Sequence, residues 1–193
     1  MKGILFKPDM IEAIIEGKKT QTRRVIKPQP TGMESLILLD KGINGFAYLD
    51  SPSGRKRIML KPRYQVGETV YIKEGIHRFN IEYASYDLDF TPVMFLLSAN
   101  RFHWRWERDK LSPMFLPHEA ARHFITITDV RAERVKEICY TDCANEGFGN
   151  HSALILAKGE FIKTWDSINK LPYDWQSNPW VWVYEFRINE IEG

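Results

Sequence analysis

Short alternating and β-branched runs dominate the hydrophobic pattern and predict strands at both ends of the chain. Residues 3–6 are an apolar run, and residues 180–188 alternate as a half-buried strand does. The β-branched and aromatic run at 69–74 predicts a strand that ends at Glu74. Three further runs at 36–39, 46–49 and 58–60, separated by Gly-rich and Pro-rich turns, predict a β meander.

Helical spacing of apolar residues occurs in a few places. Pro8 can open a short helix, which Gly17 should end. Residues 153–168 have apolar side chains at helical spacing and predict a longer helix. Before it, residues 121–135 predict one strand or a bent pair, and Thr141-Asp142 caps a short helix that ends at Gly147.

Strands therefore outnumber helices, and the first and last predicted elements are both strands. Because closure removes exposed strand edges, we predict an α+β fold: a small β-barrel flanked by two or three helices. The length of 193 residues fits one domain of roughly 100 to 200 residues. We expect a single domain over residues 1–193, with insertions at about 33–60 and 80–110.

The formal net charge of +2 hides an asymmetry along the chain. Residues 1–78 contain 15 Lys plus Arg and 8 Asp plus Glu, so they carry +7, whereas residues 79–193 contain 12 and 17 and carry −5. The positive charge gathers at 18–27 and 55–63. If folding joins these clusters, they form an electropositive face suited to phosphates; the alternative is an ordinary solvated surface.

Several function classes receive no support from the sequence. No apolar run approaches the ~18 residues of a membrane helix, and residues 1–24 are charged throughout, so we expect a soluble cytoplasmic protein with no membrane association. Cys139 and Cys143 are expected to be free thiols. His118 and His123 do not have the spacing of a metal site, and we predict neither a metal nor a cofactor.

The densest group of cations is the loop at 17–24, which holds four basic residues within seven positions. Mutual repulsion favours the neutral form of a lysine, and burial would act in the same direction. A neutral amine can serve as a base or nucleophile. The alternative is a solvated basic loop.

Gly17, Lys19 and Arg24 fit the signature Gly-x-Lys-x-x-Glu-x-Arg, so the chain resembles the ASCH domains, relatives of the PUA-like β-barrels. The runs at 4–8, 19–24 and 178–183, with the strand ending in Glu74, resemble the phage and prophage branch of that family. The resemblance implies a PUA-like barrel that binds RNA or a modified nucleoside. Thr22 occupies the position of the signature's glutamate.

The pattern is also similar to the small ASCH amidohydrolases that deacetylate N4-acetylcytidine, whose functional positions match Lys19, Thr22, Arg24 and Glu74. The resemblance implies that Lys19 is the nucleophile or general base, that Thr22 polarises or positions the substrate, and that Glu74 transfers protons. Arg24 would hold charge or ligand. The alternative for Glu74 is a salt bridge to Arg24 or Lys19.

Aromatic residues interleaved with arginines at 101–108, among them Trp104 and Arg105, suit stacking on nucleobases, although core packing is the alternative. Our leading prediction is a protein that binds RNA, other single-stranded nucleic acid or a modified nucleoside. Its alternatives are an amidohydrolase on N4-acylated cytidine or a ribonuclease, and a protein-interaction adaptor. The predicted ligand-binding residues are Gly17, Lys18, Lys19, Thr20, Arg23, Arg24, Arg63, Trp104 and Arg105.

Overall fold

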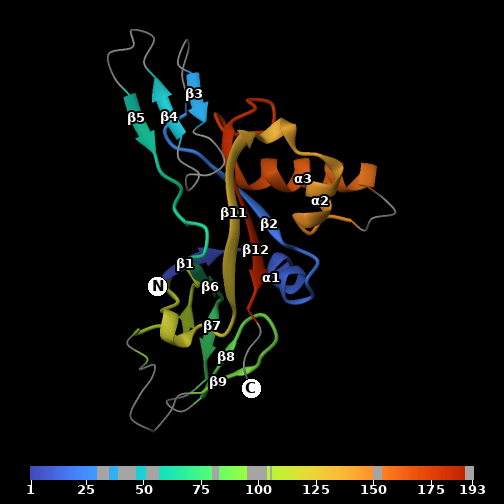
Figure 1. Cartoon of the computed structure of the whole chain (residues 1–193). Helices are drawn as coiled ribbons and strands as arrows, with labels where there is room; N and C mark the ends of the chain where they lie inside the picture. Colours follow the sequence, from blue (N-terminus) through green and yellow to red (C-terminus); the bar gives the residue numbers. More distant parts are fainter. Residues whose placement is uncertain are drawn as a thin grey trace. The chain divides into compact units, whose positions relative to one another are not determined.

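The computed structural model of the protein describes residues 1–29, 35–38, 47–50, 57–79, 83–94, 104, 106–149 and 154–189. Helices and strands are both present, so the predicted α+β class is confirmed. Figure 1 shows the elements along the chain. Their contacts group them into two compact units: unit 1 is Met1–Ile15, Thr69–Ile125 and Ile188–Gly193, and unit 2 is Glu16–Glu68 and Thr126–Arg187.

Unit 1 begins with the predicted strand and helix. β1 (Lys2–Leu5) pairs in parallel with β6 (Thr69–Lys73), so the predicted strand before Glu74 is confirmed. Helix α1 (Pro8–Ile15) starts at its proline and buries Ile11 and Ile14. The chain therefore places the first turn of α1 directly after β1.

Unit 1 also contains strands that the hydrophobic pattern does not reveal. β10 (Lys110–Leu111), β7 (Ile76–Arg78), β8 (Tyr83–Tyr86) and β9 (Pro92–Met94) form an antiparallel sheet in that order. β9 is an edge strand, the position where a sheet tolerates proline. Short 3-10 turns at Pro113–Phe115 and His118–Ala120 cover a core that includes Ile76 and Leu116.

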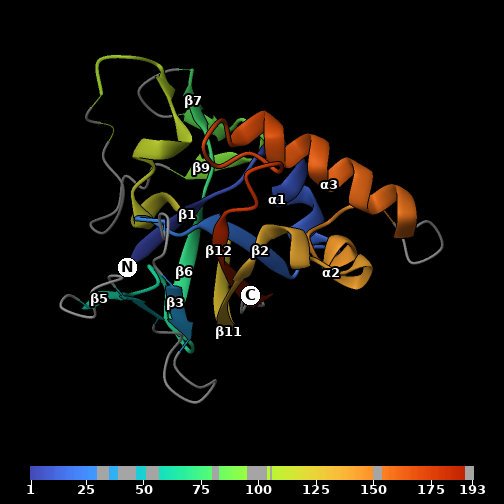
Figure 2. The ribbon, with the colours of Figure 1, turned by 90° about the horizontal axis from the view of Figure 1, so that it is seen from above.

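Unit 2 contains the closing strand and the longer helix. β12 (Trp180–Ile188) lies between β2 (Gln21–Val25) and β11 (Phe124–Arg134) in the strand order, and it pairs antiparallel with β2. β11 is one continuous strand, not a bent pair. Helices α2 (Tyr140–Asn145) and α3 (Leu154–Ile168) lie side by side, as Figure 2 shows.

The predicted meander is confirmed in unit 2, where β3 (Ser35–Leu38), β4 (Ala47–Asp50) and β5 (Arg57–Leu60) pair antiparallel. The strands do not close into a barrel within the ranges described, because β1 pairs only with β6 and β2 pairs only with β12. None of the helices in these ranges combines the length and hydrophobicity needed to cross a bilayer.

Helix α2 is capped by Cys139; of the predicted Thr141-Asp142 pair, Asp142 takes part in the cap through its side chain. The Cys139 Sγ accepts a hydrogen bond from the Asp142 backbone N–H at 3.4 Å, and Asp142 Oδ2 accepts one from the Cys139 N–H at 3.4 Å. Gly147 follows the end of the helix with φ of +91°, as predicted.

We expect Cys139→Ser to be more stable than Cys139→Ala by about 1 kcal/mol, because the serine hydroxyl can accept the N-cap hydrogen bond and the alanine methyl group cannot. Urea unfolding of the two variants measures the difference. Equal unfolding free energies would show that this cap does not stabilise α2.

Candidate functional site

The signature loop places Lys19 in the interior of unit 2. Gly17 adopts a φ of +71°, a left-handed conformation that favours glycine, and so redirects the chain after α1. Lys18 stays exposed and pairs with Glu16 at 2.6 Å. The next residue, Lys19, is only 1% exposed. The structure therefore does not present the loop as a uniformly solvated basic segment.

Lys19 holds the residue that follows α2. Its Nζ donates to Glu146 Oε2 and to the Glu146 backbone oxygen, both at 2.7 Å. The Thr20 N–H adds a bond to the Asn145 carbonyl at 2.8 Å. Burial lowers the pKa of Lys19, although the Glu146 carboxylate opposes this change. The lysine thus fixes the signature loop to the end of α2.

Arg23 extends this contact into a network of buried charges. Its Nη1 lies 3.1 Å from Glu146 Oε1, and its Nη2 lies 2.6 Å from Glu133 Oε1 and 2.9 Å from Asp142 Oδ2. We call Lys19, Arg23, Glu133, Asp142 and Glu146 the buried ion network. Its three acids were not predicted as site residues.

Thr22 and Arg24 lie on the opposite face of β2 from Arg23, because successive strand residues alternate. In the β2–β12 register, Thr22 is paired with Tyr184. The Tyr184 hydroxyl accepts a hydrogen bond from the Arg63 N–H at 3.1 Å. The centres of the Tyr64 and Tyr184 rings lie 5.3 Å apart. The structure thus brings Arg63 to the face that carries Thr22 and Arg24. Burial lowers the pKa of Arg24.

Glu74 belongs to unit 1 and has a different partner from the one expected. It is 2% exposed at the end of β6, where Arg122 Nη2 donates to its Oε1 at 2.7 Å and Arg122 Nε to its Oε2 at 3.0 Å. The salt bridge to Arg24 or Lys19, the alternative considered for Glu74, stays a prediction. The carboxylate that lies beside Lys19 within unit 2 is Glu146.

The predicted aromatic site at 101–108 is only partly described. Trp104 lies in unit 1 and packs against the hydrophobic core. The centre of its ring lies 5.3 Å from the centre of the Trp106 ring. Arg78 lies over the Trp104 ring at 5.2 Å. Arg105 lies outside the described residues. These contacts correspond to the core-packing alternative for Trp104.

A second group of cations and aromatic rings gathers along the loop before β12 and at the first residue of that strand. Lys27 lies 4.7 Å from the centre of the Tyr173 ring, Lys158 lies 5.9 Å from that of Trp175, and Arg134 lies 4.7 Å from that of Trp180. The three rings are partly exposed. We call this group the cation–aromatic surface; it comprises Lys27, Arg134, Lys136, Lys158, Tyr173, Trp175 and Trp180.

Hydrogen bonds hold this loop in one conformation. Arg134 Nη1 donates to the Asn178 carbonyl at 2.9 Å, and the Lys136 N–H donates to Asn178 Oδ1 at 3.0 Å. The Trp175 N–H donates to Asp166 Oδ1 at 2.7 Å. Sequence reasoning did not find the surface, because its cations come from separate segments. The one signal in the sequence is the spacing of Tyr173, Trp175 and Trp180 within eight positions. In β12, Trp182 is buried and Trp180 is partly exposed.

No family model matches the sequence, and no curated protein matches it either. Among solved structures, the crystal structure of protein EF3133 from Enterococcus faecalis V583, with the family designation DUF984, is similar with a TM-score of 0.39 and 10% identity. The match covers 97% of this chain and 80% of that chain. At this level, it assigns neither a family nor a function.

Replacing Glu146 should destabilise the protein more than replacing Lys19. Glu146→Met leaves two buried cations without this carboxylate, and we expect a loss of about 3–5 kcal/mol. Lys19→Met should cost less, because Glu146 retains Arg23 at 3.1 Å. In a urea double-mutant cycle, the two losses should add to more than the loss in the double variant. Strict additivity would contradict a coupled pair.

The Arg122 contacts in unit 1 predict a defined acid dependence. Although burial acts in the opposite direction, hydrogen bonds from Arg122 and Thr91 lower the pKa of Asp89 from 3.8 to about 2. As the pH falls, Asp89 therefore becomes protonated in the unfolded state before it does so in the folded state. The stabilisation that ionised Asp89 gives the folded state is complete above about pH 4 and is lost as the pH falls towards 2. Urea unfolding should show the advantage of wild type over Asp89→Asn vanishing across this range. An advantage independent of pH would contradict the assignment.

Proposed function

We propose that the protein binds nucleic acid, with single-stranded RNA as the first choice, or a modified nucleoside, through unit 2. The observation that carries this proposal is the cation–aromatic surface. Two partly exposed rings, Tyr173 and Trp175, lie in the anchored loop, and Trp180 begins β12; each has a cation over it, and Trp175 also packs on one side against the core. A fourth cation, Lys136, donates to the Gln176 carbonyl at 3.3 Å.

This combination suits an unpaired strand. Every nucleobase can stack on an aromatic ring, a contact worth about 1–3 kcal/mol per base, while lysine and arginine attract the phosphates. Two nearby acids form hydrogen bonds within the loop: Asp166 accepts one from the Trp175 N–H, and Asp174 accepts one from the Ser177 N–H. The surface therefore retains cationic groups for an anionic ligand.

The signature residues have a supporting role in this proposal. The buried ion network neutralises Lys19 and Arg23 internally and fixes β2 against α2. β2 then carries Thr22 and Arg24 on its other face, where a nucleoside could be held. The resemblance to ASCH domains, through Gly17, Lys19 and Arg24, supports the same ligand class, and the proposal includes membership of that family.

One observation favours a second candidate, an amidohydrolase acting on N4-acylated cytidine. Lys19 is a buried amine whose pKa is lowered by burial, and a carboxylate lies 2.7 Å away. Such a pair can take a proton from water as it attacks the acyl carbon, and return it to the departing amine. The balanced reaction converts N4-acetylcytidine and water to cytidine and acetate. Glu146 would then carry the role assigned to Glu74 by resemblance.

RNA binding should weaken when the cations over the loop are removed. For Lys27→Gln combined with Lys158→Gln, we expect about a tenfold loss of affinity for a single-stranded RNA oligomer at low salt. The slope of the logarithm of the binding constant against the logarithm of the salt concentration should also become shallower, by about 0.7 for each lost phosphate contact. Fluorescence anisotropy at several salt concentrations measures both.

Lys163→Gln is the matched control, since this exposed lysine lies on α3 outside the surface. Binding that is undetectable, independent of salt, or reduced equally by the control would overturn the nucleic-acid proposal.

The hydrolase candidate has a separate test. Incubation of the wild type with N4-acetylcytidine should release cytidine and acetate, and Glu146→Gln and Lys19→Arg should abolish this release. If Glu74→Gln retains activity, Glu146 is the proton-transferring carboxylate. Absence of turnover across a panel of acylated nucleosides, by a protein shown to be folded, would exclude the hydrolase.

A further inference from the structure

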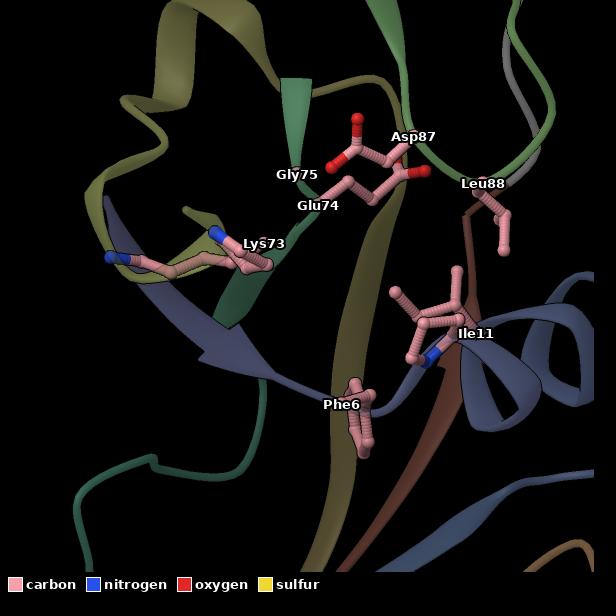
Figure 3. A pocket seen from close by; sticks show the side chains of 9 residues that line it. Phe6, Ile11, Lys73, Glu74, Gly75, Asp87 and Leu88 are labelled. Atoms are coloured by element: carbon pink, nitrogen blue, oxygen red, sulfur yellow. The ribbon is translucent and has the colours of Figure 1, made fainter. Parts of the chain in front are cut away.

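Unit 1 contains a cavity that the proposed nucleic-acid surface does not use. Its volume is about 100 Å³, and Phe6, Ile11 and Leu88 form apolar walls. Figure 3 shows Phe6 and Ile11 on one side of this cavity and the side chains of Glu74 and Asp87 on the other. The cavity thus combines an apolar body with one polar end.

The polar end consists of two carboxylates from different segments. Arg122, which is not a lining residue, donates a hydrogen bond to each oxygen of the Glu74 carboxylate. These two bonds fix the orientation of the carboxylate. Asp87 lies beside Gly75, whose backbone oxygen accepts the Asp87 N–H at 2.9 Å. A Cβ atom at position 75 would collide with Asp87 Oδ2, so glycine is needed for this approach.

Lys73, the third charged residue that lines the cavity, directs its ammonium to groups outside this polar end. The Lys73 ammonium donates to the Met114 carbonyl at 2.6 Å and lies 5.8 Å from the centre of the Tyr71 ring. Lys110 lies 3.8 Å from Asp87 Oδ2 in an exposed ion pair, which contributes little. The groups that face the cavity therefore offer hydrogen-bond acceptors.

We propose that this cavity binds a compact apolar group that bears an amidine or a protonated amine. The apolar group would pack against Phe6, Ile11 and Leu88, and its N–H groups would donate to Asp87 and to the remaining lone pairs of Glu74. Such charge-assisted hydrogen bonds are the strong ones. The cavity is not enclosed, and its volume is about two thirds of the roughly 150 Å³ that accommodates benzene, so one small ring would fill it and leave its outer edge at the mouth. This site is independent of the nucleic-acid proposal.

Benzamidine is a suitable first probe, with benzyl alcohol and benzoate as its neutral and anionic counterparts. By calorimetry or NMR titration of the full chain near pH 7, benzamidine should bind more tightly than benzyl alcohol, and benzoate should not bind. Asp87→Asn should reduce benzamidine affinity about tenfold or more. Asp109→Asn, an exposed acid outside the lining, should leave it unchanged.

Gly75→Ala provides a second route to the same conclusion, because it displaces the Asp87 carboxylate without removing its charge. It should also weaken benzamidine binding, with a chain that remains folded by circular dichroism. Equal affinities for the three probes, or unchanged affinity in Asp87→Asn, would overturn the proposal. So would a failure of both benzamidine and cyclohexylamine to bind at about 10 mM.

Discussion

The ion pair between Lys19 and Glu146 is the constraint on which the organisation of unit 2 depends. Removing two charges from water costs several kcal/mol each, unless hydrogen bonds satisfy them. Here the lysine finds both the carboxylate and the backbone oxygen of one residue, and Arg23 binds the other carboxylate oxygen. The loop after α1, the strand β2 and the end of α2 can therefore adopt only one arrangement relative to one another.

This arrangement changes the meaning of the charge asymmetry. The excess of cations in the first part of the chain suggested an electropositive face, but Lys19 and Arg23 are neutralised by acids from the second part. The cations on which the proposed function depends are Lys27, Arg134 and Lys158, each beside an aromatic ring. The +7 and −5 thus partly describe an internal pairing. Of the cluster at 55–63, Arg55 and Lys56 lie outside the described residues, whereas Arg63 lies at the face of β2 that carries Thr22 and Arg24.

The strands at 69–73 and 180–188 and the helix at 8–15 could be predicted, because periodicity and proline act locally. The partners of Lys19 and Glu74 could not. Glu146 is 127 positions from Lys19, and Arg122 is 48 positions from Glu74. Which acid meets which cation depends on strand order and register, and a single sequence does not specify these. β9 was missed because Pro92 argues against a strand except at an edge.

The function proposed here depends on a loop whose rings and cations were assembled by tertiary structure from segments before and after it. The most direct test is photocrosslinking of a 4-thiouridine RNA oligomer to the full chain, with the attachment sites mapped by mass spectrometry. We predict attachment at Tyr173, Trp175 or Trp180, and its loss with added salt. Attachment confined to unit 1, or no attachment while RNA binding is measurable, would contradict the account.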